Sequence, residues 1–152
     1  MATNDDTISE LNKLIETCKD GEYGFRSCAE HAKAAELKNV FEARAQECRR
    51  AADELREQVV ACGGKAEDSG TAAGALHRGW VAARSVLTGY TDHAMLEECE
   101  RGEDVAVTRY RNALEKGLPD ELRALVERHL LGAQRNHDQV KALRDRYPAT
   151  AS

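Results

Sequence analysis

The chain has 152 residues, of which 41% are hydrophobic, 32% are charged and only 5% are aromatic. This length and apolar fraction suit a single domain with one continuous core, and the scarcity of aromatic residues and prolines favours long helices over a sheet. A formal net charge of −5 and the lack of a long apolar segment argue against nucleic acid and membranes as partners.

The first half of the chain predicts two helices joined by a tight turn. Thr7 and Glu10 have the spacing of a capping box, and the apolar residues after them recur at three- and four-residue steps. This pattern predicts a helix over about residues 8–35, preceded by a flexible tail at 1–6. A second seam of apolar residues, ended by a pair of glycines, predicts a helix over about 40–62.

The second half repeats this arrangement after a polar connection. A shorter segment predicts a crossover helix over about 72–88, followed by helices over about 92–116 and 119–145 and a frayed tail at 147–152. Two hairpins separated by one long connection are typical of ferritin-like bundles. We therefore expect an all-α, ferritin-like four-helix bundle that forms a single domain over residues 1–152.

The cysteines lack the spacing of a zinc site or a disulfide framework, because their number is odd and no CxxC pair occurs. Most of them lie inside predicted helices, where a free thiol behaves as a small buried hydrophobe. The N-terminus also lacks the features of a secretory signal, so we expect free thiols in a cytoplasmic protein. The cysteines are Cys18, Cys28, Cys48, Cys62 and Cys99.

An internal repeat relates the two predicted hairpins. The pattern CxxGE ends at Glu22 in the first helix and, 81 residues later, at Glu103. Both glutamates fall on the apolar face of their helix, so both are expected to point into the bundle. A buried carboxylate is costly unless it is paired, protonated or bound to metal, so the two residues mark a candidate interior site. The alternative is one solvated glutamate at the flank of each hairpin.

A di-iron bundle takes one glutamate from each of two helices and a Glu-x-x-His pair from each of the other two. On the second helix, the window expected to face Glu22 runs from Asp53 to Arg56. On the last helix, the window expected to face Glu103 runs from Gln134 to His137. Only His137 is a good ligand, since an arginine stays protonated and a glutamine oxygen binds weakly. We therefore expect an eroded site, in which Arg56 supplies positive charge in place of a metal and Gln134 lies beside it.

One iron or manganese ion is the alternative occupant of this pocket. Carboxylate oxygens together with an imidazole suit either ion. The candidate ligands are Glu22, Asp53, Glu100, Glu103 and His137. The sequence predicts no further cofactor.

Several different short motifs occur along the chain. They are DGE at 20–22, GF at 24–25, SG at 69–70, LHRGW at 76–80, ERGE at 100–103 and RNH at 135–137. Together they resemble a small bacterial family of ferritin-like four-helix-bundle proteins of unknown function, from about residue 8 to 146. The resemblance implies the bundle fold and an interior pocket, but no established reaction. The LHRGW segment has no counterpart in a metal template, and we expect it to pack the crossover onto the bundle.

Three hypotheses for function follow. The leading one is a non-oxidase binding or structural module with a carboxylate-rich pocket and a role in bacterial stress physiology. The second is a metal-dependent oxidase or metal-handling protein, and the third is a homo-oligomer subunit that acts through its exposed helix faces. No Cys-His or Ser-His-Asp arrangement supports nucleophilic catalysis, so enzymatic activity enters only through the second hypothesis, and the leading one is non-enzymatic.

Overall fold

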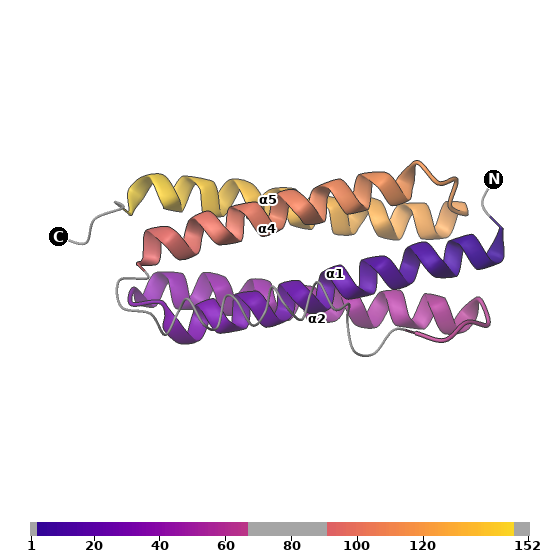
Figure 1. Cartoon of the computed structure of the whole chain (residues 1–152), viewed down its shortest axis with the longest axis horizontal. Helices are drawn as coiled ribbons and strands as arrows, with labels where there is room; N and C mark the ends of the chain where they lie inside the picture. Colours follow the sequence, from indigo (N-terminus) through magenta and orange to yellow (C-terminus); the bar gives the residue numbers. More distant parts are fainter. Residues whose placement is uncertain (1–2, 67–90, 148–152) are drawn as a thin grey trace.

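Four long helices make up the part of the chain that the structure, a computed structural model, describes: residues 3–66 and 91–147. They are α1 (Asn4–His31), α2 (Ala35–Ala61), α4 (Asp92–Leu114) and α5 (Asp120–Arg146), and no strand occurs within these ranges (Figure 1). None of these helices is long and apolar enough to cross a membrane. The predicted crossover helix over 72–88 and the LHRGW segment lie outside the described residues.

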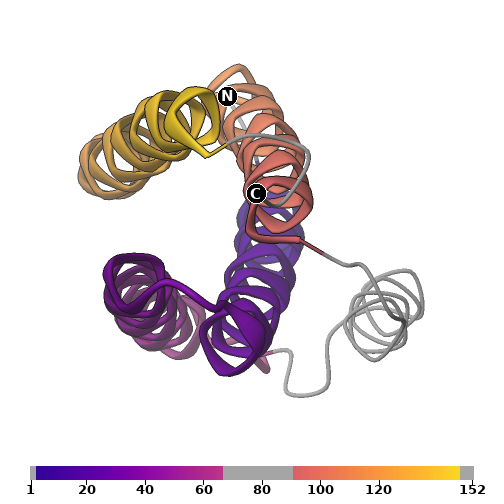
Figure 2. The ribbon, with the colours of Figure 1, turned by 90° about the vertical axis from the view of Figure 1, so that its left-hand side faces the viewer.

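The helices form two antiparallel hairpins that pack side by side. α1 packs along α2 and α4 along α5, while α1 also contacts α4. The end-on view shows α1 and α4 at the junction between the hairpins, with α2 and α5 on the same side of that junction (Figure 2). α2 ends and α4 begins at opposite ends of the bundle (Figure 1), which is the connectivity of a ferritin-like bundle with one long crossover.

α1 begins earlier than predicted. Its N-cap is Thr3, whose Oγ1 accepts a hydrogen bond from the Asp6 amide at 3.1 Å, while the Asp6 carboxylate accepts one from the Thr3 amide at 3.3 Å. This reciprocal pair is a capping box, and it satisfies an amide that the first turn of a helix leaves free. Thr7 and Glu10 have the same spacing but lie buried inside the helix, so the predicted start at residue 8 is wrong.

The turn between α1 and α2 also lies earlier than predicted. α1 ends at His31 and α2 begins at Ala35, against predicted boundaries of 35 and 40. The Asp92 carboxylate, at the start of α4, accepts hydrogen bonds from the amides of Lys33 (2.9 Å) and Ala34 (3.1 Å). Because this partner lies 58 and 59 residues away along the chain, local sequence patterns do not reveal where the turn closes.

The remaining helix ends agree closely with prediction. Gly63, after α2, and Gly117, after α4, have positive φ angles of 81° and 74°, which glycine adopts without a steric penalty at the end of a helix. Thr91 caps α4 by accepting a hydrogen bond from the Ala94 amide at 3.1 Å. Pro119 immediately precedes α5, where its missing amide costs no helical hydrogen bond.

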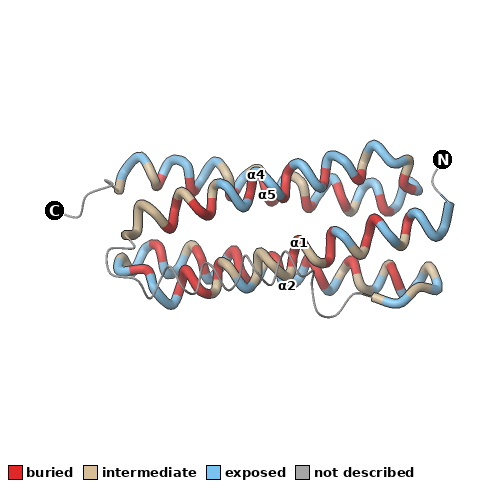
Figure 3. The backbone as a smooth tube through the Cα atoms, in the orientation of Figure 1, coloured by how far each residue is buried: buried red, intermediate tan, exposed pale blue. Residues whose placement is uncertain are grey.

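Buried residues alternate with exposed ones along all four helices, as expected where one face of each helix packs into the bundle (Figure 3). Their apolar members form two clusters, one toward the start of α1 and the other toward its end. On α4 the change from one cluster to the other falls between Cys99 and Ala106, and on α5 between Ala133 and Val140. These two gaps are where polar side chains enter the core.

Candidate functional site

A buried ion pair lies where the two apolar clusters meet. Glu103 of α4 is only 2% exposed, and Arg44 of α2 is 7% exposed. The Arg44 guanidinium donates two hydrogen bonds to the Glu103 carboxylate, from Nε to Oε2 at 2.8 Å and from Nη2 to Oε1 at 3.1 Å. Asn136 of α5 donates a third, from Nδ2 to Oε2 at 2.6 Å. One carboxylate therefore joins three helices, and both of its oxygens accept hydrogen bonds.

Helical periodicity brings these side chains to the same place. Glu103 lies four residues after Cys99 and three before Ala106, so it shares their inward face between the two clusters. Asn136 holds the corresponding position on α5. Arg44 starts about one turn from the boundary on α2 and reaches it with its long side chain.

Burial and pairing oppose each other in this ion pair. Burial raises the pKa of the Glu103 carboxyl above its usual value, against the lowering effects of Arg44 and Asn136. Burial lowers the pKa of Arg44, but Cys48 and Glu103 raise it by more, so the guanidinium stays charged. Nη1 of Arg44 also faces Glu47 at 3.4 Å. Removal of one partner would leave a buried charge whose desolvation is no longer offset.

A cavity of about 260 Å³ lies beside the ion pair, between α1 and α4. Arg44 and Glu103 form part of its wall. Gly24 and Gly102 border it without filling it, because a Cβ atom at either position would meet no atom of residues 3–66 or 91–147 within 4 Å. The thiols that line the cavity are buried, as predicted for helical cysteines; they belong to Cys18, Cys28, Cys48 and Cys99.

Three weakly polar side chains of the wall, Cys18, Cys48 and Tyr110, are uncharged at neutral pH. The Cys18 thiol lies 3.1 Å from the Tyr110 hydroxyl. Burial raises the pKa of Cys18 to about 11, and it raises the pKa values of Cys48 and Tyr110 as well. The wall therefore combines apolar side chains with weakly polar thiols, and its buried charged residues include Glu98 as well as the Arg44–Glu103 pair.

Glu22, the counterpart of Glu103 in the repeat, has a different environment. Its side chain is 26% exposed and pairs with Arg26 on the same helix at 2.9 Å. Glu103 therefore points into the bundle as predicted, whereas Glu22 lies at its edge.

The repeat itself explains this difference. Glu103 accepts its hydrogen bonds from Arg44 and Asn136. Through the 81-residue offset, the position equivalent to Arg44 is Leu125, and the position equivalent to Asn136 is Leu55. Leucine has no group that can pair with a carboxylate. The repeated half consequently offers Glu22 no equivalent of the partners that allow Glu103 to be buried.

The other predicted pocket residues lie apart from the ion pair. Asp53 and Arg56 pair with each other along α2 at 3.3 Å, and Asp53 is exposed. Gln134 is half-buried on α5. The interior cation is thus Arg44, and the prediction that Arg56 supplies this charge is wrong.

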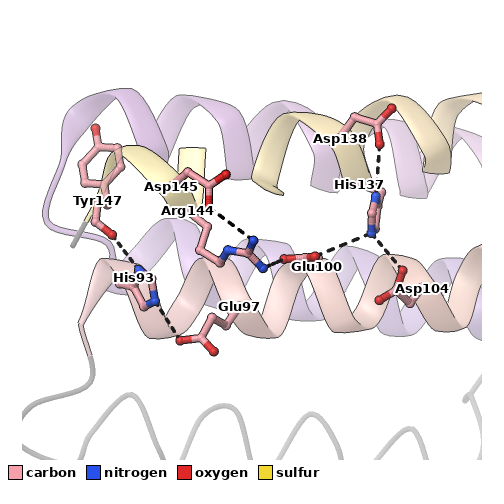
Figure 4. Close-up of polar contacts among 9 residues, drawn as sticks. All are labelled: His93, Glu97, Glu100, Asp104, His137, Asp138, Arg144, Asp145 and Tyr147. Carbon is pink, nitrogen blue, oxygen red and sulfur yellow. Dashed lines mark hydrogen bonds and ion pairs between the residues drawn. The ribbon is translucent and has the colours of Figure 1, made fainter. Parts of the chain in front are cut away.

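His137 of α5 and Glu100 of α4 point toward each other between these two helices (Figure 4), and neither contributes to the hydrogen bonds of Glu103. His137 Nε2 lies 2.9 Å from Asp104 Oδ1 and 3.8 Å from Glu100 Oε2. Glu100 also pairs with Arg144. The structure thus brings two of the five predicted ligands together, but in a chain of ion pairs that includes an arginine.

These positions do not fit a di-metal centre. Within residues 3–66 and 91–147, no group of three or more histidine, cysteine, aspartate or glutamate side chains is arranged to hold a metal ion. The Glu103 carboxylate already accepts three hydrogen bonds. The positive charge of Arg44 beside it would also repel a cation.

Sequence reasoning missed Arg44 and Asn136 as site residues. Arg44 lies three residues after Phe41 and four before Cys48, both of which are buried, so this spacing was a signal for an inward-facing side chain. Asn136 forms the middle of the RNH motif, in which the histidine is the better metal ligand. Arg44 and Asn136 are hydrogen-bond donors to a carboxylate, and the template of a metal site does not call for such donors.

Solved structures share the fold of this chain. The conserved hypothetical protein rv2844 from Mycobacterium tuberculosis superimposes with a TM-score of 0.77 at 12% identity, covering 99% of both chains. A mutant of Dps1 from Mycobacterium smegmatis gives 0.74 at 16% identity, over 93% of this chain and 96% of that one. The DPS protein from Vibrio cholerae O1, described as a member of a broad superfamily of ferritin-like diiron-carboxylate proteins, gives 0.72 at 16% identity, over 92% and 89%. At these identities the likeness shows the ferritin-like fold alone.

Comparison with curated proteins gives no match. Residues 6–116, which contain α2 and α4 completely and nearly all of α1, match the family described as Domain of unknown function (DUF2383). This match covers well over half of the chain. The protein therefore belongs to the DUF2383 family, whose function is unknown, and its fold is that of a ferritin-like four-helix bundle.

Proposed function

We propose that this protein is a binding module that takes up a small, uncharged and mainly apolar molecule in the cavity between α1 and α4. The supporting observation is the cavity together with the two glycines on its border, Gly24 and Gly102. A glycine inside a helix costs about 1 kcal/mol relative to alanine. Within the part of the chain that the structure describes, no atom near either Cβ position requires a glycine there. Retaining both at that cost is consistent with a use for the space they leave.

The size of the cavity limits the ligand. Small-molecule pockets span roughly 300–1,000 Å³, and an apolar cavity of about 150 Å³ is enough to hold benzene. A cavity of about 260 Å³ therefore suits a molecule of one or two rings. A nucleotide-sized cofactor would not fit within it.

The charges of the lining disfavour an anion. Among the described residues, the charged ones in the wall are two arginines and three carboxylates, namely Arg44, Arg109, Asp20, Glu98 and Glu103. Arg44 is paired with Glu103, and Arg109 donates a hydrogen bond to the Thr17 hydroxyl at 3.0 Å. No surplus of positive charge faces the cavity. The thiols and the Tyr110 ring favour a polarisable, uncharged ligand.

Indole is a suitable probe for this site. It should bind the wild-type protein and shift the amide resonances of residues that line the cavity in ¹H–¹⁵N spectra. The variant Gly24→Leu/Gly102→Leu should fold and fail to bind, because the added side chains start from positions that open onto free space. Val60→Leu, at a position 66% exposed near the end of α2, is the matched control and should bind like the wild type. Equal binding by the double variant and the control would refute the proposal.

The occupied carboxylate of Glu103 leads to a second expectation, for iron and manganese. Protein purified without chelator should contain substoichiometric amounts of both metals by mass spectrometry, and added Fe²⁺ or Mn²⁺ should leave the Tm unchanged. The reason is that Arg44 already neutralises Glu103 in the interior. One metal ion per chain that is lost in both Glu103→Ala and His137→Ala would instead favour the metal-dependent oxidase or metal-handling hypothesis.

A further inference from the structure

Two of the cavity thiols are in contact with each other. Cys28 of α1 and Cys99 of α4 have their sulfur atoms 3.8 Å apart, with Cys99 Sγ donating to Cys28 Sγ. Both are buried, at 4% and 6% exposure, and both line the cavity. The other two cavity thiols have different neighbours: Cys18 contacts the Tyr110 hydroxyl, and Cys48 packs beside Gly21.

We propose that Cys28 and Cys99 are an oxidisable pair that hydrogen peroxide converts into a disulfide between α1 and α4. In the first step, the Cys28 sulfur attacks one peroxide oxygen, the O–O bond breaks, and the products are a Cys28 sulfenic acid and water. In the second step, the Cys99 sulfur attacks the sulfenic sulfur, the S–O bond breaks, and the hydroxyl leaves as a second water with the proton of Cys99. Two thiols lose two electrons, and one peroxide gains them.

The hydrogen bond assigns the two roles. Cys99 is the donor, so its proton stays on its own sulfur while a lone pair of Cys28 accepts it. Burial, Cys28 and the carboxylates of Glu98 and Glu103 all raise the pKa of Cys99, which keeps it a thiol until the second step. The same carboxylates disfavour an anionic product in this place, whereas a disulfide is uncharged.

The cavity supplies access and room. Hydrogen peroxide is little larger than water, and the space beside Gly24 and Gly102 reaches the wall that Cys28 and Cys99 form. A disulfide needs a sulfur–sulfur distance of about 2.0 Å, so the two side chains must approach each other by roughly 1.8 Å. Free volume next to both sulfurs allows the side-chain rotations that this approach requires.

The cross-link would join the two hairpins directly. α1 and α4 belong to different hairpins, and a disulfide between them closes a loop that contains all of α2. Such a closed loop restricts the unfolded chain and should stabilise the oxidised protein. Disulfides of proteins in a reducing compartment are commonly transient and redox-sensing, which this pair would suit.

The test begins with fully reduced wild-type protein treated with hydrogen peroxide. Thiol titration in denaturant should show the loss of two of the five thiols. A tryptic digest without reduction should contain residues 27–33 linked to residues 85–101. The Tm should rise by roughly 5–10 °C and return to its starting value with dithiothreitol.

Matched variants locate the reaction. Cys28→Ser and Cys99→Ser should lose the cross-link and the rise in Tm, while Cys62→Ser, outside the cavity at the end of α2, should keep both. The proposal is overturned if peroxide links other cysteines, or if Cys28 reaches sulfinic acid without a cross-link. The peptide map of the wild-type protein decides between these outcomes even if a serine variant fails to fold.

Discussion

Arg44→Met should lower the free energy of unfolding by roughly 3–5 kcal/mol at pH 8. Methionine retains much of the apolar length of the side chain but removes the charge and both hydrogen bonds to Glu103. The Glu103 carboxylate, 2% exposed, would keep its hydrogen bond from Asn136 and lose its cationic partner. Urea unfolding followed by circular dichroism measures this loss.

The loss should be smaller at pH 5 than at pH 8. Burial already raises the pKa of Glu103 above its ordinary value of 4.5, and Arg44 lowers it, so removal of Arg44 raises the folded-state pKa further. A carboxyl whose folded pKa exceeds its unfolded pKa binds more protons in the folded state. Its unfavourable contribution is therefore absent at low pH and grows as the pH rises through the folded pKa. An equal loss at the two pH values would contradict this assignment.

Two further variants distinguish the cost of an unpaired buried charge from the cost of replacing an arginine by methionine. Arg44→Met/Glu103→Leu removes both charges and should recover most of the loss, although Asn136 would then lack its acceptor. Arg26→Met makes the same chemical change beside Glu22, the repeat counterpart of Glu103. It should cost less than about 1 kcal/mol, because the ion pairs of Arg26 with Glu22 and Glu42 are only partly buried and such solvated pairs contribute little to stability.

The bundle was predictable because periodic apolar residues determine where helices form and which faces they bury. Helix ends followed from the sequence where the signal is local, as at Gly63, Gly117 and Thr91. They did not follow at the turn between α1 and α2. There the anchoring carboxylate is Asp92, which belongs to the other hairpin.

The error at this turn also explains why the interior cation was misassigned. α1 ends four residues earlier, and α2 begins five residues earlier, than the sequence predicts. When the turn moves toward the N-terminus, the position on α2 that faces Glu22 moves by the sum of the two displacements. It therefore moves from Asp53 to Arg44. The second hairpin turn was predicted closely. Its window, from Gln134 to His137, does contain Asn136, which bonds to Glu103.

Gly21 and Gly102, equivalent positions in the repeat, should respond oppositely to alanine. A Cβ at Gly21 would lie 2.9 Å from Cys48 Sγ, where α1 packs closely on α2. Gly21→Ala should therefore destabilise the protein by roughly 1–3 kcal/mol through overpacking. Gly102→Ala meets open space and should stabilise it by about 0.5–1 kcal/mol, because alanine favours the helix. Urea unfolding of both variants provides the comparison.

Cys48→Ala in the Gly21→Ala background tests the cause, since the smaller side chain removes the sulfur that the new Cβ would meet. It should restore part of the stability, whereas the same substitution with Gly102→Ala should give only the sum of the separate effects. An equal gain from alanine at both glycines would show that Cys48 yields freely and that α1 does not need this close approach. Alanine is expected to lower the free energy of unfolding at Gly21 and to raise it at Gly102. The two halves of the repeat therefore use the equivalent glycine for different purposes. α1 uses it to pack against α2, and α4 uses it to leave space beside Glu103.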